Sequence, residues 1–202
     1  MTRACARTAT AWALTWALLV AGCSSRPAEQ PAPGPPDRAE SEVPAPPPPA
    51  TAGQVTLRTL DENHFAETLK KYRGKVILVD FWATWCAPCK EDFPHAVRLH
   101  RQLADRGLAV VSVSLDPLEN EPQVLKFLTA QGATCDNFIA RHGGSGEAFE
   151  VLQIPDGTLP NLKLFDRGGK LRKTFPQPSS PIKPAEIDRA VKELLAEPAG
   201  PG

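Results

Sequence analysis

The stretch "KVILVDFWATWCAPCKEDFP", residues 75–94, decides the fold. Its first part, residues 75–83, is almost continuously apolar and β-branched, which is typical of a strand buried on both faces of a sheet. A helix is predicted to follow, because Pro88 suits the first helical turn, where its missing amide has no helical partner. Cys86 and Cys89 therefore stand where a buried strand passes into a helix.

This position indicates redox chemistry. A cysteine at a helix N-terminus meets unpaired backbone amides and the positive end of the helix dipole, and both favour the thiolate. The Cys-x-x-Cys spacing lets the second thiol reach the first on one helical turn. The sequence therefore predicts that Cys86 is an exposed nucleophile of low pKa and that Cys89 is a shielded resolving thiol.

The segment "VDFWATWCAPCK" resembles the active-site stretch of the thioredoxin superfamily, and specifically of its TlpA-like extracytoplasmic branch. Residues 157–170, "GTLPNLKLFDRGGK", resemble the cis-proline loop and hairpin of that superfamily. The insert at about 116–152 is similar to the one in the TlpA-like branch. The resemblance covers essentially the whole folded domain and implies an α/β thioredoxin fold, with a mixed central sheet flanked by helices.

The same resemblance implies roles for individual residues. Cys86 and Cys89 would form a redox-active disulfide, and Asp80, buried with a raised pKa, would relay protons to Cys89. The residues implied in substrate binding are Trp85, Pro88, Leu159 and Pro160, with Pro160 as the cis-proline. The implied activity needs no cofactor and no metal. Its implied partners are protein thiols and disulfides, for example those of apocytochrome c, and a quinol- or thioredoxin-linked membrane electron donor.

Two positions depart from the thioredoxin pattern. The lysine that pairs with the buried acid in thioredoxins aligns with Ser112 here, and the residue after Pro160 is Asn161 instead of the common threonine. The first departure bears on the relay role of Asp80, and the second on contacts with the substrate backbone.

The N-terminus is predicted to be an export signal. Arg3 and Arg7 precede an apolar stretch at residues 9–22, which is shorter than the ~20 residues of a membrane-spanning helix. The stretch ends in "LVAGC", which resembles a bacterial lipobox and makes Cys23 the expected lipidation site. An ordinary secretory signal is the alternative. Both interpretations place the protein outside the cytoplasm, where disulfides persist, in the cell envelope facing the periplasm or exterior.

Composition divides the rest of the chain. Residues 24–50 contain ten of the 22 prolines and few large apolar side chains, so this segment is predicted to be an unfolded, extended tether. The predicted organisation is a signal peptide (1–22), the lipidated cysteine with its tether (23–52), a thioredoxin-like domain (53–197) and a disordered tail (198–202).

Within the domain, periodicity and turn signals predict alternating strands and helices. The expected strands are residues 54–60, 75–83, 108–116, 161–165 and 170–175, with a short edge strand at 133–140. The expected helices are 61–72, capped by Asp61, then 86–106, 120–132, 147–152 and one that begins at Pro184 and ends before Pro198.

Other functions find less support. Lysine plus arginine and aspartate plus glutamate balance at 23 each, so no electrostatic argument favours nucleic acid. A zinc site would need Cys135 and His142 beside the cysteine pair, and nothing in the sequence brings them there. A copper or zinc metallochaperone on the same fold is the main alternative. Cys135 is predicted to be a buried free thiol, with an intermolecular disulfide as the alternative, and the four histidines are predicted on the surface.

Overall fold

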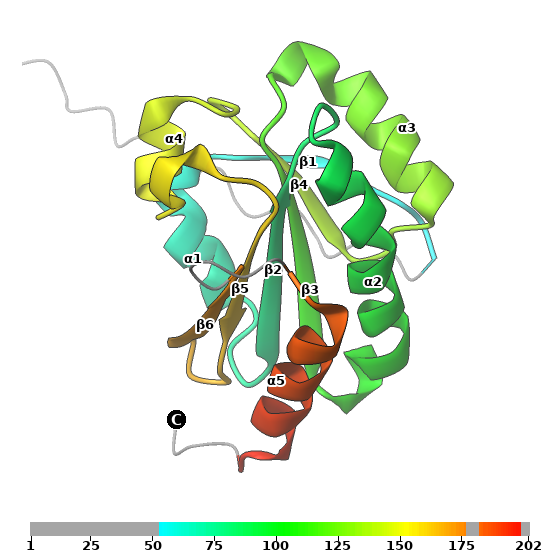
Figure 1. Ribbon diagram of the computed structural model, residues 1–202, viewed down its shortest axis with the longest axis vertical. Helices are drawn as coiled ribbons and strands as arrows, with labels where there is room; N and C mark the ends of the chain where they lie inside the picture. The colour runs from blue at the N-terminus through cyan, green and yellow to red at the C-terminus, as the bar shows by residue number, and fades with distance from the viewer. Residues whose placement is uncertain (1–52, 177–181, 199–202) are drawn as a thin grey trace, which may run out of the picture. The chain divides into compact units, whose positions relative to one another are not determined.

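The computed structural model describes residues 53–176 and 182–198. Six strands form one mixed sheet in the order β1-β4-β3-β2-β5-β6 (Figure 1). The strands are β1 (Arg58–Leu60), β2 (Val76–Trp82), β3 (Leu108–Ser114), β4 (Asp136–Ala140), β5 (Asn161–Phe165) and β6 (Leu171–Phe175). Strands β1 to β4 run parallel to one another, β5 pairs antiparallel with β2, and β6 pairs antiparallel with β5. The predicted α/β thioredoxin-type sheet is confirmed.

Helices cover both faces of this sheet. The α-helices are α1 (Phe65–Lys70), α2 (Ala87–Leu103), α3 (Glu121–Gln131), α4 (Gly146–Val151) and α5 (Pro184–Ala196). Short 3-10 helices are η1 (Glu62–His64), η2 (Ala104–Arg106), η3 (Leu118–Asn120) and η4 (Pro155–Gly157). Side chains of α2, α3 and α5 pack in one core layer, and those of α1 pack in a second layer, against which Phe149 of α4 also packs.

Strand β2 lies at the centre because its sequence offers apolar side chains to both layers. All seven of its residues are buried, and it pairs with β3 on one side and β5 on the other. The chain leaves β2 between the two layers and turns directly into α2. The cysteine pair therefore sits at the carboxyl end of the central strand, where parallel sheets commonly place functional groups.

Capping and turn residues mark the ends of several helices. Asp61 caps η1 by accepting a hydrogen bond from the amide of Asn63, and Pro184 is the first residue of α5. Gly132 ends α3 with a φ of 60°, a left-handed conformation that glycine adopts without steric cost. The predicted helix at 86–106 divides into α2 and η2, and α2 continues through Pro94.

One placement was wrong. The strand predicted at the sheet edge, β4, is interior, because it pairs with β3 on one side and β1 on the other. The polar pair Asp136 and Asn137 does not mark an edge, because Asn137 is buried and its side-chain amide donates to the backbone carbonyls of Ala133 and Cys135. The edge is formed by β1, which is only three residues long.

The predicted signal peptide, Cys23 and the proline-rich tether all lie outside the described residues. Within the ranges 53–176 and 182–198, none of the helices is both long and apolar enough to cross a membrane.

Candidate active site

The cysteine pair forms a disulfide at the first turn of α2. Cys86 is the N-cap of the helix, and the Cα atoms of Cys86 and Cys89 are 5.3 Å apart. The backbone amide of Cys89 points at the Cys86 sulfur, with 3.3 Å between nitrogen and Sγ. This amide has no backbone partner within the helix, and because it points at the sulfur it favours negative charge there. Cys86 is therefore the sulfur that the fold prepares to be a thiolate.

The exposure of the two cysteines differs less than predicted. Cys86 is 6% exposed and Cys89 2% exposed in this disulfide form. Cys86 is slightly more exposed than Cys89, but it is not the openly exposed residue that was predicted, because it is buried in the same core cluster as Trp82 and Ala83.

A buried carboxylate that the sequence analysis missed holds the loop before Cys86. Asp116 is fully buried just after β3, and its side chain accepts hydrogen bonds from the Thr84 amide at 2.8 Å and from the Thr84 hydroxyl. The hydroxyl of Ser114 donates a third bond at 2.7 Å. Because Thr84 lies two residues before Cys86, Asp116 fixes the strand-to-helix loop that carries the reactive sulfur.

Asp80 is buried in the same layer as Cys89. It is 5% exposed and shares its face of β2 with Leu78 and Trp82, which pack in the core cluster that contains Cys89. Burial, with a smaller contribution from the charge of Asp92, raises the pKa of Asp80 to about 7. Its neighbour across β3 is Ser112, as the alignment predicted. This carboxyl group therefore keeps its proton to a higher pH than an exposed aspartate does.

The two tryptophans have different surroundings. Trp82 is fully buried and donates its indole N–H to the Ser112 hydroxyl at 2.8 Å, whereas Trp85 is 58% exposed. Pro88 is exposed on the first turn of α2. The peptide bond between Leu159 and Pro160 is cis, as predicted, and both residues are half-buried at the start of β5. Asn161, which follows Pro160, pairs with Phe81 near the carboxyl end of β2, the strand that leads to the disulfide.

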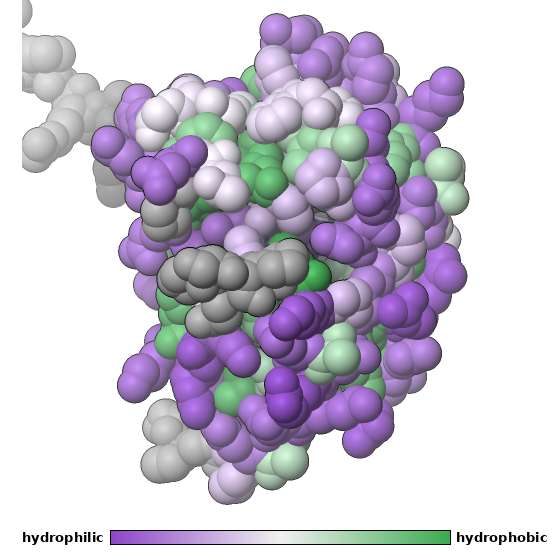
Figure 2. Space-filling view, viewed as in Figure 1, coloured by the Kyte–Doolittle hydropathy of each residue, from purple (hydrophilic) through white to green (hydrophobic). Residues whose placement is uncertain are grey.

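A groove begins at Trp85. It has a volume of about 680 Å³ and runs to α4 and η4, where Phe149 and Gly157 contribute to its lining. Figure 2 shows white and green side chains over α4, bordered by purple ones. Gly157 has a φ of 63°, and a Cβ there would come within 2.9 Å of the Phe149 ring, so the ring packs directly on glycine backbone.

A second polar contact that the sequence did not reveal ties α4 to β5. Lys163, in β5, is 3% exposed and donates to the carbonyls of Leu152 and Gln153, just after α4. Burial lowers the pKa of Lys163 to about 8. The side chain was hidden in the apolar pattern "NLKLF" and fixes the segment that leads from α4 to the cis-proline.

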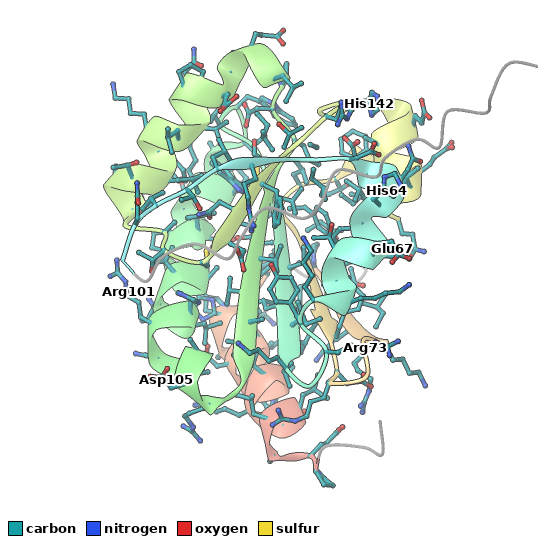
Figure 3. All side chains as sticks on the ribbon, turned by 180° about the vertical axis from the view of Figure 1, so that it is seen from behind. His64, Glu67, Arg73, Arg101, Asp105 and His142 are labelled. Carbon is teal, nitrogen blue, oxygen red and sulfur yellow. A yellow bond between two sulfur atoms is a disulfide. The ribbon has the colours of Figure 1, made fainter. Side chains whose placement is uncertain are left out.

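Two of the four histidines, His95 and His100, depart from the surface prediction. His95 is buried in α2, with its Nε2 2.7 Å from an Asp188 oxygen in α5, and His100 is half-buried. His142 is exposed, as predicted, and contacts the buried Glu62 through its backbone amide at 2.8 Å and its Nδ1 at 3.0 Å. Figure 3 shows His142 near His64 at the α1 end of the domain. The contact between His142 and Glu62 anchors the loop that leads from β4 towards the groove at Trp85.

Cys135 is a buried free thiol, as predicted. It is 3% exposed, its sulfur donates to the Asn137 side chain, and burial raises the pKa of its thiol to about 12. A thiol held in this state cannot readily form the intermolecular disulfide considered above. Among the described residues, no cluster of three or more histidine, cysteine, aspartate or glutamate side chains is arranged to hold a metal ion.

Comparison with known families agrees with this geometry. Residues 50–174 match the model of the AhpC/TSA family. The chain belongs to this family, which has a thioredoxin-like fold.

The curated relatives of the chain include thiol-disulfide oxidoreductases. It is 32% identical over 124 residues to the thiol-disulfide oxidoreductase ResA of Geobacillus thermodenitrificans, covering 61% of this chain and 66% of the relative. It is 33% identical over 105 residues to the thioredoxin-like protein YneN of Bacillus subtilis, covering 52% of this chain and 59% of the relative. The chain thus spans between about half and two thirds of the curated relatives it matches.

Solved structures agree on the fold. The thioredoxin domain of a thiol-disulfide oxidoreductase from Bacteroides vulgatus superposes with a TM-score of 0.53 at 20% identity, over 63% of this chain and 84% of that domain.

Proposed function

We propose that the chain is a thiol-disulfide oxidoreductase of the cell envelope that reduces disulfides in other proteins through Cys86 and Cys89. The observation that carries the proposal is the disulfide at the N-terminus of α2, with a backbone amide aimed at the Cys86 sulfur. The relatedness to ResA supports the same activity. Apocytochrome c is the substrate that the TlpA-like resemblance implies.

The reaction exchanges two electrons. In the reduced chain, the Cys86 thiolate attacks a substrate disulfide, forms a mixed disulfide and releases one substrate thiolate, which takes up a proton. Cys89 then gives its proton to the carboxylate of Asp80 and attacks the Cys86 sulfur, releasing the second substrate thiolate, which is protonated in turn. The substrate gains two thiols and the chain is left with the Cys86–Cys89 disulfide.

Asp80 suits the role of proton acceptor because of its surroundings. A group whose pKa is about 7 both accepts and returns protons near neutral pH. Trp85, Pro88, Leu159 and Pro160 would contact the substrate. Trp85 precedes Cys86, Pro88 lies between the two cysteines, and Leu159 and Pro160 lead into Asn161, which pairs with Phe81 near the carboxyl end of β2. A substrate strand would lie beside the cis-proline and pair with exposed backbone there.

The proposal extends to location and electron supply. A lipid on Cys23 would hold the domain at a membrane on the proline-rich tether, and a membrane donor of quinol- or thioredoxin-linked type would reduce the disulfide after each turnover. Such a donor is needed because each cycle leaves the chain oxidised.

A redox titration of the full chain tests the activity and its direction. The chain is equilibrated with thiol buffers of known potential, and free thiols are counted by alkylation and mass. We expect one two-electron transition on the reducing side of glutaredoxin-like potentials, below about −200 mV. Cys86→Ser and Cys89→Ser are the matched controls and should remove it. A potential near about −120 mV, that of a strong oxidant, would contradict reduction as the function.

The alternative function is a metallochaperone. Among the described residues, no group of possible metal ligands supports it. Copper or zinc titration of the reduced chain, followed by the same thiol count, would distinguish it, because a bound metal would protect both cysteines from alkylation.

A further inference from the structure

The groove that begins at Trp85 has a defined chemical character. Its wall on one side is aromatic, formed by the exposed Trp85 and by Phe149. Two charged residues, Glu150 and Asp156, are found among the described residues that line the groove, and both are acidic. Both side chains are exposed, and the chain as a whole has a formal net charge of zero, so the negative charge is a local property of the groove.

The groove also borders the redox site along the chain. At one end it is lined by Trp85, which directly precedes Cys86. At the other end, the segment that carries Asp156 and Gly157 leads within three residues to the cis-proline at Pro160. A polypeptide whose disulfide lies against Cys86 therefore has its neighbouring residues beside the aromatic wall and the two carboxylates.

We propose that this groove binds the residues that flank the reacting disulfide of a protein substrate, and that it selects flanking segments bearing lysine or arginine. The inference rests on the proposed oxidoreductase function and adds the charge of its substrates. Lysine and arginine have aliphatic stems that pack on aromatic rings, and their cationic heads are attracted both to ring faces and to carboxylates. An acidic segment would meet two like charges and lose this attraction.

The exposure of the two carboxylates limits how much they can change the reaction rate. Because Glu150 and Asp156 are solvent-exposed, their attraction acts mainly on association and is screened by salt over about 10 Å at 0.1 M ionic strength. We expect roughly tenfold faster reaction with a cationic segment than with an anionic one at low salt, within the range known for electrostatic steering.

Matched peptides test the proposal with the reduced full chain. Each peptide holds one internal disulfide and differs only in the two residues beside its first cysteine, which are lysine, serine or glutamate. Rate constants are measured at low salt and at 0.5 M salt, and each is divided by the rate of the same peptide with dithiothreitol. This uncharged dithiol corrects for the effect of neighbouring charges on the peptide's own sulfurs.

The wild type should prefer the lysine peptide to the glutamate peptide by about tenfold at low salt, and the preference should shrink in 0.5 M salt. The double variant Glu150→Gln with Asp156→Asn should lose the preference, and Glu150→Lys, which sets one ammonium against the remaining carboxylate of Asp156, should lose it as well. Asparagine is chosen at 156 because that residue has a φ of 57°, which asparagine tolerates. Glu147→Gln, on α4 but not lining the groove, is the matched control and should keep the preference.

The outcomes separate this proposal from the oxidoreductase function. Equal corrected rates for all peptides, with normal reduction of the neutral disulfide 2,2′-dithiodipyridine, would overturn the charge selection alone. A preference that persists in the double variant would place the selecting charges elsewhere and also overturn it. If neither peptides nor dithiodipyridine were reduced, both proposals would fall. Dimers in solution that dissociate in the double variant would assign the groove to a second copy of the chain.

Discussion

At the scale of single residues, Asp80 shows how burial produces a proton acceptor. Its carboxyl group lies in an apolar layer where water cannot solvate the ionised form, and the charge of Asp92 opposes ionisation further. The sequence could indicate this, because Asp80 interrupts a run of apolar, β-branched residues. A carboxyl group with a pKa near 7 can, in its ionised form, take the proton that Cys89 must lose, and this role is our explanation for the cost of burying it.

Replacing Asp80 by asparagine should stabilise the oxidised chain at high pH. The pKa of Asp80 is raised from 3.8 to about 7, so between these values the native state holds a proton that the unfolded chain has released. The free energy of unfolding therefore falls as pH rises from about 4 to about 7. Asp80→Asn should remove this fall and, by the size of the pKa difference, gain on the order of 4 kcal/mol over wild type at pH 8 and little at pH 4.

Urea unfolding at both pH values measures this difference. Asp105→Asn is the matched control, because Asp105 is exposed at the end of α2 and η2 (Figure 3) and should change stability by less than about 0.5 kcal/mol. Equal stabilities of wild type and Asp80→Asn at pH 8 would show that Asp80 ionises there without penalty, and would remove the physical basis of its relay role.

At the scale of elements, the active site depends on contacts between segments far apart in sequence. Periodicity predicted β2, α2 and the hairpin of β5 and β6, because each is determined by its own apolar pattern and turn residues. It could not predict that Asp116 binds Thr84, or that Glu62 binds His142, since these pairs are separated by 32 and 80 residues.

Buried polar side chains caused the other differences. Lys163 and Asn137 lie in short strands, where a polar residue would be expected to face solvent or to mark an edge strand. Both are buried, and their side-chain nitrogens donate hydrogen bonds to backbone carbonyls. No local rule shows which carbonyls will lie nearby. The signal that remains in the sequence is the polar residue itself, as for Lys163, which stands between Leu162 and Leu164.

The bond between Thr84 and Asp116 should hold the loop before Cys86. Thr84→Ala leaves the buried carboxylate with one donor fewer and should cost about 2 kcal/mol of unfolding free energy, as expected for a hydrogen bond to a charged group. Amide hydrogen exchange at Trp85 and Cys86 should become faster, because the loop loses its anchor. Thr129→Ala, exposed on α3, is the control and should cost less than about 0.5 kcal/mol. Unchanged exchange at Trp85 would show that other contacts fix the loop.

At the scale of the whole molecule, the folded domain would carry out the redox chemistry, and the N-terminal segment would determine where it takes place. The domain brings the disulfide, Asp80 and the groove to one end of its sheet, and its relatives are redox proteins. The proposed anchor determines which proteins this end can meet. A soluble reductant would diffuse through its compartment, whereas a lipid-held one on a proline-rich tether would search a layer up to roughly 80 Å from its membrane, at ~3.1 Å per residue.

The anchor is tested by the mass and the partitioning of the mature protein. Each buried CH₂ contributes ~0.8 kcal/mol, so two or three acyl chains on Cys23 would hold the protein firmly, where one chain would bind only weakly. We expect the wild-type N-terminal peptide to begin at Cys23 and to carry acyl mass, and the protein to enter the detergent phase. Cys23→Ala should lose the acyl mass, whereas Cys5→Ala, within the predicted signal, should leave it unchanged. A wild-type N-terminus that starts elsewhere or carries no acyl chain would contradict lipid anchoring, and the domain would then reach its substrates as a secreted or signal-anchored protein.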